Sequence, residues 1–283
     1  MSYYSPPYPS SSPEARVLAR LTGRLDRTKT ARSIERFIAG YVKSARAEGG
    51  VVMGLSGGLD SAVVVALCTR ALGAGRVLGL ILPGASTPNE DVEDAAAHAR
   101  KLGIEHQTIN IEPIVERYMQ VLSDGANNDK VARGNLTARV RMSVLYYHTY
   151  IDGSRKRLVV GTSDKSEISI GYFTKFGDGG ADITPIADLY KTQVRELGRY
   201  LKVPDAILQK KSSPRLWANH TAEDEIGISY ESIDPILYML MDRKKTAKET
   251  AAELGVPVDR VKRVQEMIAK SAHKRAMPAA PKL

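Results

Sequence analysis

Apolar and amphipathic segments alternate along the middle of the chain. Residues 51–55, 76–82, 104–111 and 158–160 are predicted strands, and the continuous apolar run within 76–82 indicates burial on both faces, as in a parallel sheet. Between these strands, residues 62–72, 87–102 and 131–150 and the stretch after Pro113 have helical character. Strands that alternate with helices predict an α/β fold, a doubly wound parallel sheet with helices on both faces.

Helical periodicity flanks this region on both sides. Residues 15–50 carry it as far as the stop signal Gly49-Gly50, and residues 191–201, 230–241, 246–254 and 258–270 carry it nearer the C-terminus. The sequence Thr87-Pro88-Asn89-Glu90 predicts a capping box with proline at the first helical position. We expect a disordered tail over residues 1–13, a single domain over 14–275 and a second tail over 276–283.

A glycine-rich loop separates the first predicted strand from its helix. It runs Gly54-Leu55-Ser56-Gly57-Gly58-Leu59-Asp60-Ser61. Gly57 and Gly58 let the backbone turn with its N–H groups inward, and the helix that follows adds the positive end of its dipole, so the loop suits a phosphate. Asp60 would repel phosphate unless a divalent cation lies between them. The loop lacks the lysine of a Walker A motif, and a plain strand–helix turn with serine as the helix cap remains the alternative.

A second loop, Gly161-Thr162-Ser163, follows the last predicted strand. Ligands of parallel sheets bind at the carboxyl ends of the strands, so this loop and the glycine-rich loop are expected to face one ligand. Residues 176–182 are too rich in glycine and acid for regular structure and predict a mobile loop. Its acids, Asp178 and Asp182, have little stabilising role to play between glycines, which favours a functional interpretation.

Composition excludes several classes of protein. No apolar run approaches the length that spans a bilayer and the N-terminus has no signal-peptide core, so we expect a cytoplasmic protein without membrane contact. The single cysteine, Cys68, allows no disulfide framework and reads as a buried thiol. The net charge is +9, but acids interleave with the densest basic cluster near the C-terminus, which favours a solvated helix face over a nucleic-acid site.

Several motifs in order resemble one family. They are the glycine-rich loop, residues 135–142, 160–167, 171–182, 189–193, 224–230 and His273-Lys274-Arg275. Together they resemble the ammonia-dependent NAD synthetases, especially the archaeal ones, which belong to the N-type ATP pyrophosphatases with an adenine nucleotide alpha-hydrolase-like fold. The segment Lys211-Ser212-Ser213-Pro214 departs from the family pattern, in which a proline often precedes the Ser or Thr.

The resemblance implies a reaction and a set of roles. ATP adenylates the carboxylate of nicotinic acid adenine dinucleotide, ammonia then displaces AMP, and Mg²⁺ and a homodimer are expected. The pyrophosphate would lie in the loop from Gly54 to Ser61, with Mg²⁺ on Asp60 and Glu167. The motifs assign ATP contacts to Thr162, Lys191 and Ser213, and dinucleotide contacts to Arg139, Lys175, Asp182, His273 and Lys274. Asp60 and Lys191 are the expected catalytic residues, together with Asp178 as the candidate that deprotonates ammonium.

Simpler interpretations stay open at this point. Asp164 and Glu167 have the spacing of a capping box, Arg139 and Arg141 could form surface ion pairs, Lys191 could be a solvated first-turn lysine, and His273 could simply be exposed. For the whole protein, the alternatives are another ATP pyrophosphatase with a different acceptor, or a non-enzymatic ATP-binding sensor.

Overall fold

The computed structural model describes residues 11–122, 129–150, 156–217 and 221–281. Most of the predicted N-terminal tail lies outside these ranges. So does most of residues 124–130, whose polar sequence predicts a loop. Four strands form one sheet: β1 (Gly50–Gly54), β2 (Val77–Ile81), β3 (Glu105–Thr108) and β4 (Arg157–Val160). Their order is β3-β2-β1-β4, and every pairing is parallel.

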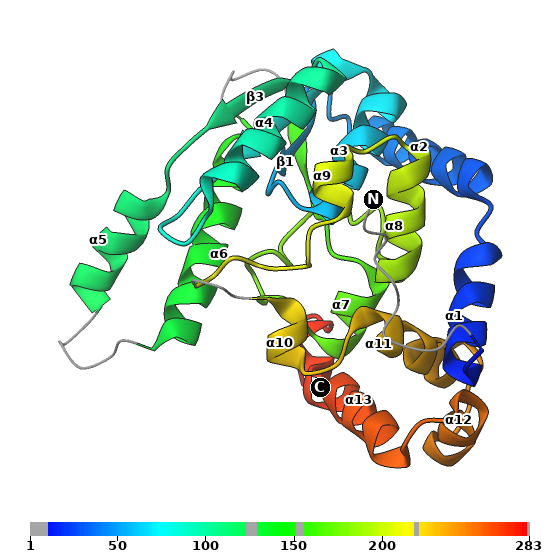
Figure 1. Ribbon diagram of the computed structural model, residues 1–283. Helices are drawn as coiled ribbons and strands as arrows, with labels where there is room; N and C mark the ends of the chain where they lie inside the picture. Colours follow the sequence, from blue (N-terminus) through cyan, green and yellow to red (C-terminus); the bar gives the residue numbers. More distant parts are fainter. Residues whose placement is uncertain (1–10, 123–128, 151–155, 218–220, 282–283) are drawn as a thin grey trace.

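Helices cover both faces of this sheet, which confirms the predicted fold class (Figure 1). On one face α2 (Arg27–Ser44), α3 (Leu59–Leu72), α4 (Asn89–Leu102) and α8 (Lys191–Tyr200) pack against Val51, Met53 and Leu158. On the other face α5 (Glu112–Leu122) and α6 (Lys130–Tyr147) pack against Val52, Leu78 and Val159. Residues that alternate along each strand therefore feed two separate cores.

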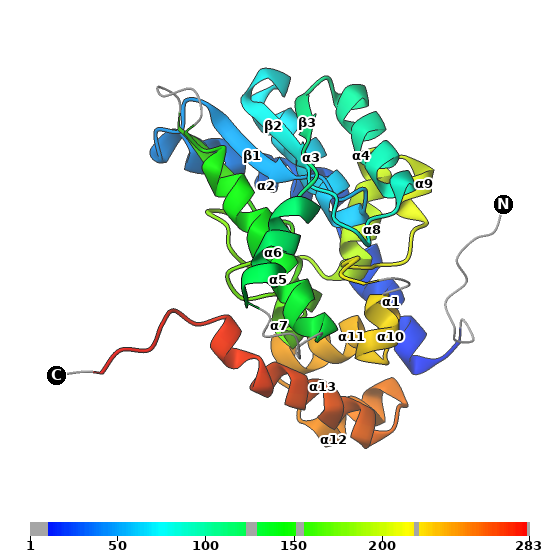
Figure 2. The same cartoon turned by 90° about the vertical axis from the view of Figure 1, so that its left-hand side faces the viewer.

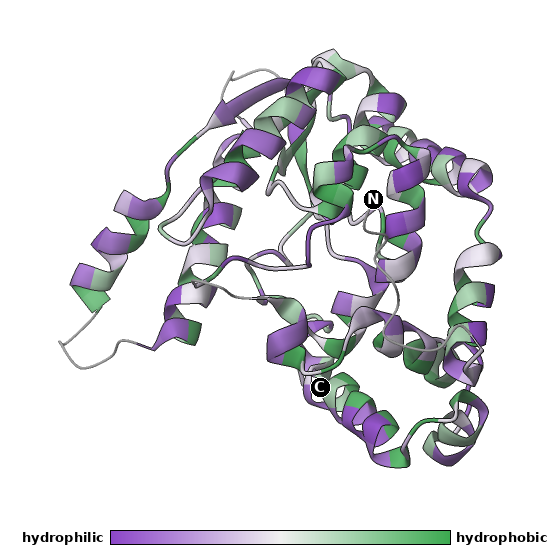
Figure 3. Ribbon diagram, viewed as in Figure 1, coloured by the Kyte–Doolittle hydropathy of each residue, from purple (hydrophilic) through white to green (hydrophobic). Residues whose placement is uncertain are grey.

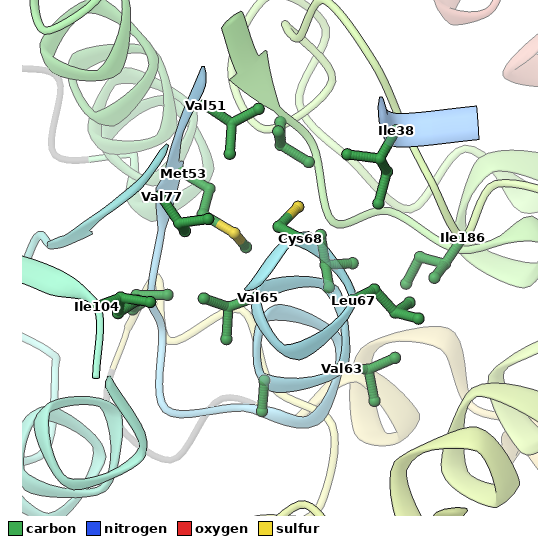
Figure 4. Packing of buried hydrophobic residues seen from close by; sticks show 14 of the residues in the cluster. Ile38, Val51, Met53, Val63, Val65, Leu67, Cys68, Val77, Ile104 and Ile186 are labelled. Carbon is green, nitrogen blue, oxygen red and sulfur yellow. The ribbon is translucent and has the colours of Figure 1, made fainter. Parts of the chain in front are cut away.

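The first core is built around α3. Apolar residues surround this helix on nearly every side, as expected of a helix enclosed by protein. Figure 4 shows Val65 and Cys68 of α3 near the strand residues Val51 and Met53, with Ile38 of α2 above. Cys68 is fully buried, and burial raises the pKa of its thiol to about 12, so it is an inert core residue as the sequence predicts.

A third group of helices has its own core. It comprises α1 (Pro13–Gly23), α7 (Lys165–Ile170), α11 (Tyr230–Leu237), α12 (Ala247–Leu254) and α13 (Val258–Lys270). Figures 1 and 2 show α11, α12 and α13 grouped on the side of the molecule away from the sheet, beyond α7. Short helices α9 (Asp205–Leu208) and α10 (Ala222–Ile226) lie in the connection before α11. A π-helical segment, η2 (Tyr238–Asp242), extends α11, and the 3-10 turns η1 (Ala74–Arg76) and η3 (Ala272–Lys274) complete the elements.

Three local details differ from what the sequence predicts. The stretch 15–50 is helical as predicted, but it forms two helices, because Asp26 accepts a hydrogen bond from the Lys29 N–H at 2.9 Å and so caps a new start. Thr87 does not cap α4, since its hydroxyl accepts the Gly84 N–H at 3.1 Å within the preceding turn. The third strand is shorter than residues 104–111 and polar along its length, as the colouring of β3 in Figure 3 shows.

No helix among the described residues combines the length and the apolar content that crossing a membrane requires.

Two neighbouring residues of α2 test this packing. Ile38 is fully buried and Phe37 is 47% exposed, so Ile38→Ala should lower the free energy of unfolding by about 2–4 kcal/mol. Phe37→Ala should lower it by less than about 1 kcal/mol, because little buried surface is lost. Denaturant unfolding of both variants measures the difference, and equal losses would contradict the assigned burial.

Candidate active site

A cleft of about 500 Å³ lies at the carboxyl ends of the strands. The glycine-rich loop after β1 and the loop Gly161–Ser163 after β4 both line it, because β1 and β4 are neighbours in the sheet. Side chains of α6 and the segment 210–217 form its other walls. The prediction that the two loops face one site is therefore confirmed.

The glycine-rich loop has the shape of an anion cradle. Gly57 has a φ of +73°, and a Cβ there would lie 2.2 Å from the Asp91 backbone oxygen, so only glycine fits. Gly58 is the N-cap of α3 and no side chain caps that end, which overturns the alternative of a serine cap. The first N–H groups of α3 are thus left facing the cleft. The hydroxyls of Ser56 and Ser61 lie 3.0 Å apart, and Ser61 Oγ accepts the Ser56 N–H, which holds the loop closed.

A buried ionic cluster lies beside this cradle. Lys191, which is 1% exposed, places Nζ 2.7 Å from Asp60 Oδ2, 2.9 Å from Asp164 Oδ2 and 2.8 Å from Glu167 Oε1. Three elements, α3, α7 and α8, supply these four side chains. Lys191 is therefore not a solvated first-turn lysine.

The cluster carries an excess of negative charge. With all groups ionised, the three carboxylates outweigh the one ammonium by two charges. Burial raises the pKa of Asp164 to about 6 and that of Glu167 well above its usual range, and each carboxylate raises the other's. Burial alone would lower the pKa of Lys191, but the surrounding carboxylates hold it well above the usual value.

The residues present fit a divalent cation. Asp60 Oδ1 is buried and has no hydrogen-bond partner in the described part of the chain. The described residues contain no group of three Asp, Glu, His or Cys side chains that could by themselves hold a metal ion. Mg²⁺, however, is usually bound through one or two carboxylates plus substrate phosphates and water. Asp60 and Glu167, beside a phosphate cradle and in a cluster short of positive charge, meet that requirement.

The capping-box interpretation of Asp164 and Glu167 is also correct. Asp164 Oδ1 accepts the Glu167 N–H at 2.8 Å, and Glu167 Oε2 accepts the Asp164 N–H at 3.4 Å. The two interpretations are compatible, because Glu167 uses Oε2 for the cap and Oε1 for Lys191. The capping box therefore holds the Glu167 carboxylate in the position where it contacts Lys191.

The other predicted residues divide into two groups. Thr162, Ser213, Asp178 and Lys274 line the cleft. Arg139, Lys175 and His273 are not part of its lining but form a chain of contacts, since Arg139 Nε donates to the Lys175 carbonyl at 3.3 Å and Lys175 Nζ donates to the His273 carbonyl at 2.7 Å. The described residues provide no acidic partner for Arg139, so the surface ion pair is not seen there.

Asp178 and Asp182, in the loop at residues 176–182, have structural partners that the sequence did not reveal. Asp182 Oδ2 accepts the Val159 N–H at 2.7 Å, which anchors the loop to β4. Asp178 Oδ1 accepts the Thr174 N–H at 2.8 Å. The expectation that acids between glycines do little for stability was wrong. Asp178 still lines the cleft, and desolvation by the surrounding walls raises the pKa of its carboxyl, although that Thr174 bond, Lys274 and Arg141 oppose the rise.

Sequence reasoning assigned no role in the site to two side chains. Arg141 lines the cleft with its Nε donating to the Leu82 carbonyl at 3.1 Å, and desolvation lowers the pKa of its guanidinium. Tyr230 places its ring 5.2 Å from Lys191 Nζ and leaves its buried hydroxyl without a partner among the described residues. Only the motif resemblance pointed to these stretches, since neither residue has a distinctive spacing.

The parallel sheet, the lysine-free phosphate cradle and the acidic cluster beside it define a nucleotide-binding α/β enzyme of the ATP pyrophosphatase type. The family model of NAD synthase matches residues 30–278, and the chain belongs to this family.

Solved and curated relatives agree with this assignment. The NH(3)-dependent NAD(+) synthetase of Hyperthermus butylicus is 50% identical over 258 residues, which are 91% of this chain and 91% of that protein. The NMN synthetase structure from Francisella tularensis has a TM-score of 0.78 at 35% identity, and covers 92% of this chain and 100% of that one. The NH3-dependent NAD synthetase from Campylobacter jejuni has a TM-score of 0.75 at 30% identity, with 91% and 100% covered. The resemblance seen in the sequence is confirmed, and the protein is a ligase of this family.

Gly57 tests the cradle. Gly57→Ala should raise the KM for ATP at least tenfold, because the added methyl group meets the Asp91 backbone and the residue must leave its positive φ. Gly40→Ala is the matched control, since nothing lies within 4 Å of its added Cβ and ATP use should not change. Steady-state kinetics against ATP measures both, and an unchanged KM in Gly57→Ala would contradict the cradle.

Proposed function

We propose that the protein amidates nicotinic acid adenine dinucleotide to NAD, with ATP as the activating substrate and ammonia as the nitrogen donor. The observation that carries this proposal is an anion cradle in the same cleft as Asp60 and Glu167, with the buried ammonium of Lys191 behind these two carboxylates, in a chain of the NAD synthase family. A carboxylate is a poor electrophile, so its conversion to an adenylate must precede attack by ammonia.

The first half-reaction uses the cradle and the cluster. A substrate carboxylate oxygen forms a bond to the α-phosphorus of ATP, and the bond to the leaving pyrophosphate breaks. The N–H groups at the start of α3 would receive the pyrophosphate, and the positive charge of Lys191, held beside the cradle by three carboxylates, would stabilise the developing negative charge. Asp60 and Glu167 are the residues that would hold Mg²⁺, which would supply positive charge to offset that of the phosphates.

The second half-reaction takes place at the acyl carbon. Ammonia forms the C–N bond, the bond to AMP breaks, and the proton that ammonium carried must be removed. Asp178 lines the cleft and has a raised carboxyl pKa, which makes it a better proton acceptor than an exposed aspartate. Thr162 and Ser213 line the same cleft and are assigned to ATP, and Lys274 is assigned to the dinucleotide.

Turnover with purified components tests the function. The protein should convert nicotinic acid adenine dinucleotide to NAD with ATP, Mg²⁺ and ammonium, and should not use ammonia-free glutamine. Nicotinic acid mononucleotide is the comparison substrate, since one similar structure is named for NMN synthesis. A preference for the mononucleotide, or no turnover of either, would overturn the proposal.

Asp60→Asn should abolish pyrophosphate release while the fold is kept. The change removes one charge from the acidic cluster and a proposed Mg²⁺ ligand. Asp259→Asn serves as control, because that side chain is 88% exposed on α13 and should leave the rate unchanged. A pyrophosphate release rate near that of the wild type in Asp60→Asn would disprove the assignment.

We propose that residues 175–182 shield the adenylate and that Asp178 acts in the ammonia step. The loop contacts α6 closely, since a Cβ at Gly177 would lie 3.0 Å from the Ala138 Cβ. Asp178→Ala should spare ATP binding, slow the ammonia step and let water hydrolyse the adenylate. The ratio of AMP to NAD at limiting ammonium should therefore rise several-fold. A ratio equal to that of the wild type, with normal turnover, would exclude both roles.

We also propose that the protein is a homodimer. Ile114, Tyr118, Val121 and Leu122 of α5 are exposed, with Val121 and Leu122 each at 68%, and Tyr147 of α6 is 72% exposed. Figure 1 shows α5 and α6 next to each other, and the two helices are in contact, so these residues belong to one helical pair. Apolar side chains exposed in such number favour an interface. Light scattering should give twice 30.9 kDa, and a fully active monomer at every concentration would rule the dimer out.

A further inference from the structure

Asp234 lies on α11, outside the cleft, yet it is the centre of a hydrogen-bond network that reaches the ionic cluster. Its side chain is completely buried. Ser166 Oγ donates to Asp234 Oδ1 at 2.5 Å. The Thr192 N–H and the Thr192 hydroxyl donate to Asp234 Oδ2 at 2.8 and 2.7 Å. The carboxyl group thus joins α7, which carries Ser166, to α8, which carries Thr192.

The network continues to the backbone of Lys191. Ser166 Oγ accepts the Lys191 N–H at 2.9 Å. The first N–H groups of a helix have no acceptor within the helix, so they must find partners elsewhere. In α8 the N–H groups of Lys191 and Thr192 find them on Ser166 and Asp234, from two other helices. Asp234 therefore caps α8 from outside, in the place where the helix dipole favours a carboxylate.

These bonds act on the backbone of Lys191 itself or on residues next to Lys191 and Glu167. Ser166 directly precedes Glu167, and Thr192 directly follows Lys191. Lys191 Nζ makes its contacts with Asp60 and Glu167 at 2.7 and 2.8 Å. A displacement of about 1 Å at either helix start would lose these contacts, and errors of that size can cost about a hundredfold in rate.

A second carboxylate joins the same two helices nearer the surface. Asp242, in the π-helical segment after α11, lies 2.9 Å from Lys165 Nζ and accepts the Tyr190 hydroxyl at 3.0 Å. Pro235 lacks the N–H that a regular helix needs, and the π segment begins three residues later. Asp234 and Asp242 thus contact the first residues of α7, Lys165 and Ser166. They also contact Tyr190 and Thr192, which flank Lys191 at the start of α8.

We propose that Asp234 is a positioning residue for the adenylation step. By capping α8 and accepting the hydrogen bond of Ser166, it holds the side chains of Lys191 and Glu167 in contact. This inference rests on the proposed amidation reaction. Asp234 does not touch the cleft, and acts only through its neighbours.

Burial raises the pKa of Asp234 to about 7. Asparagine has the shape of the neutral form and can still accept the two Thr192 bonds. Asp234→Asn is therefore the conservative variant, and Asp234→Ala removes the cap altogether.

A residue on the same helix supplies the matched control. Glu231 is 5% exposed, lies one turn before Asp234, and also reaches α8, through an ion pair with Arg195 at 3.0 Å. It contacts neither Ser166 nor Thr192 by any hydrogen bond in the described residues. Glu231→Ala removes a buried carboxylate between α11 and α8 without releasing the start of α8.

The experiment compares the steady-state kinetics of Asp234→Ala, Asp234→Asn and Glu231→Ala at a temperature where circular dichroism shows all three folded. Asp234→Ala should lower kcat for pyrophosphate release ten- to a hundredfold, with KM for the dinucleotide within threefold of the wild type. Asp234→Asn should recover kcat to within about threefold of the wild type, and Glu231→Ala should leave it unchanged.

Three results would overturn the inference: a normal kcat in Asp234→Ala, an equal loss in Glu231→Ala, or no recovery in Asp234→Asn. If Asp234→Ala does not fold, Ser166→Ala takes its place, since it cuts the link between Asp234 and the Lys191 N–H. A normal kcat in that variant would also overturn the inference. An inactive wild type would instead contradict the proposed function.

Discussion

The buried ammonium of Lys191 is the interaction on which the rest of the site depends. Three carboxylates from two helices converge on it, and none of these groups is stable inside a protein without the others. The start of α8, the capping box of α7 and the first turn of α3 must therefore be held together. Among the C-terminal helices, α11 contributes through Asp234, which binds Ser166 of α7 and Thr192 of α8, so a region outside the cleft supports the position of Lys191.

The sequence predicts the fold well where the signals are local and strong. The apolar runs of β1, β2 and β4 need burial on both faces, and Gly57 can only serve a sharp turn, so sheet type and cradle both follow. The order of the strands is harder to predict. The shared cleft was predictable, because ligands of parallel sheets bind at the carboxyl ends of the strands, where both loops lie. The motif resemblance added Lys191 and Glu167, which spacing alone left ambiguous.

The remainder could not be predicted, because it depends on contacts distant in sequence. Asp182 bonds to Val159 and Asp234 bonds to Thr192, and nothing near either acid indicates its partner. The break between α1 and α2 was missed for the opposite reason. The apolar periodicity continues past this break, whose position is set by one capping side chain, Asp26. Thr87 shows the same limit. Its hydroxyl could accept an N–H group of α4 or the Gly84 N–H, and the sequence does not indicate which of the two bonds forms.

The edges of the sheet have a consequence for how copies of the protein can associate. β3 ends the sheet with the side chains Glu105, His106, Gln107 and Thr108, which are polar and mostly exposed. At the other edge, Ile183 pairs with Val160 and Asp182 occupies the Val159 N–H. One border is thus a short polar strand and the other is partly covered, which are two ways in which proteins protect the edges of a sheet. Neither border therefore offers the long apolar edge strand through which sheets of neighbouring molecules pair in fibrous aggregates.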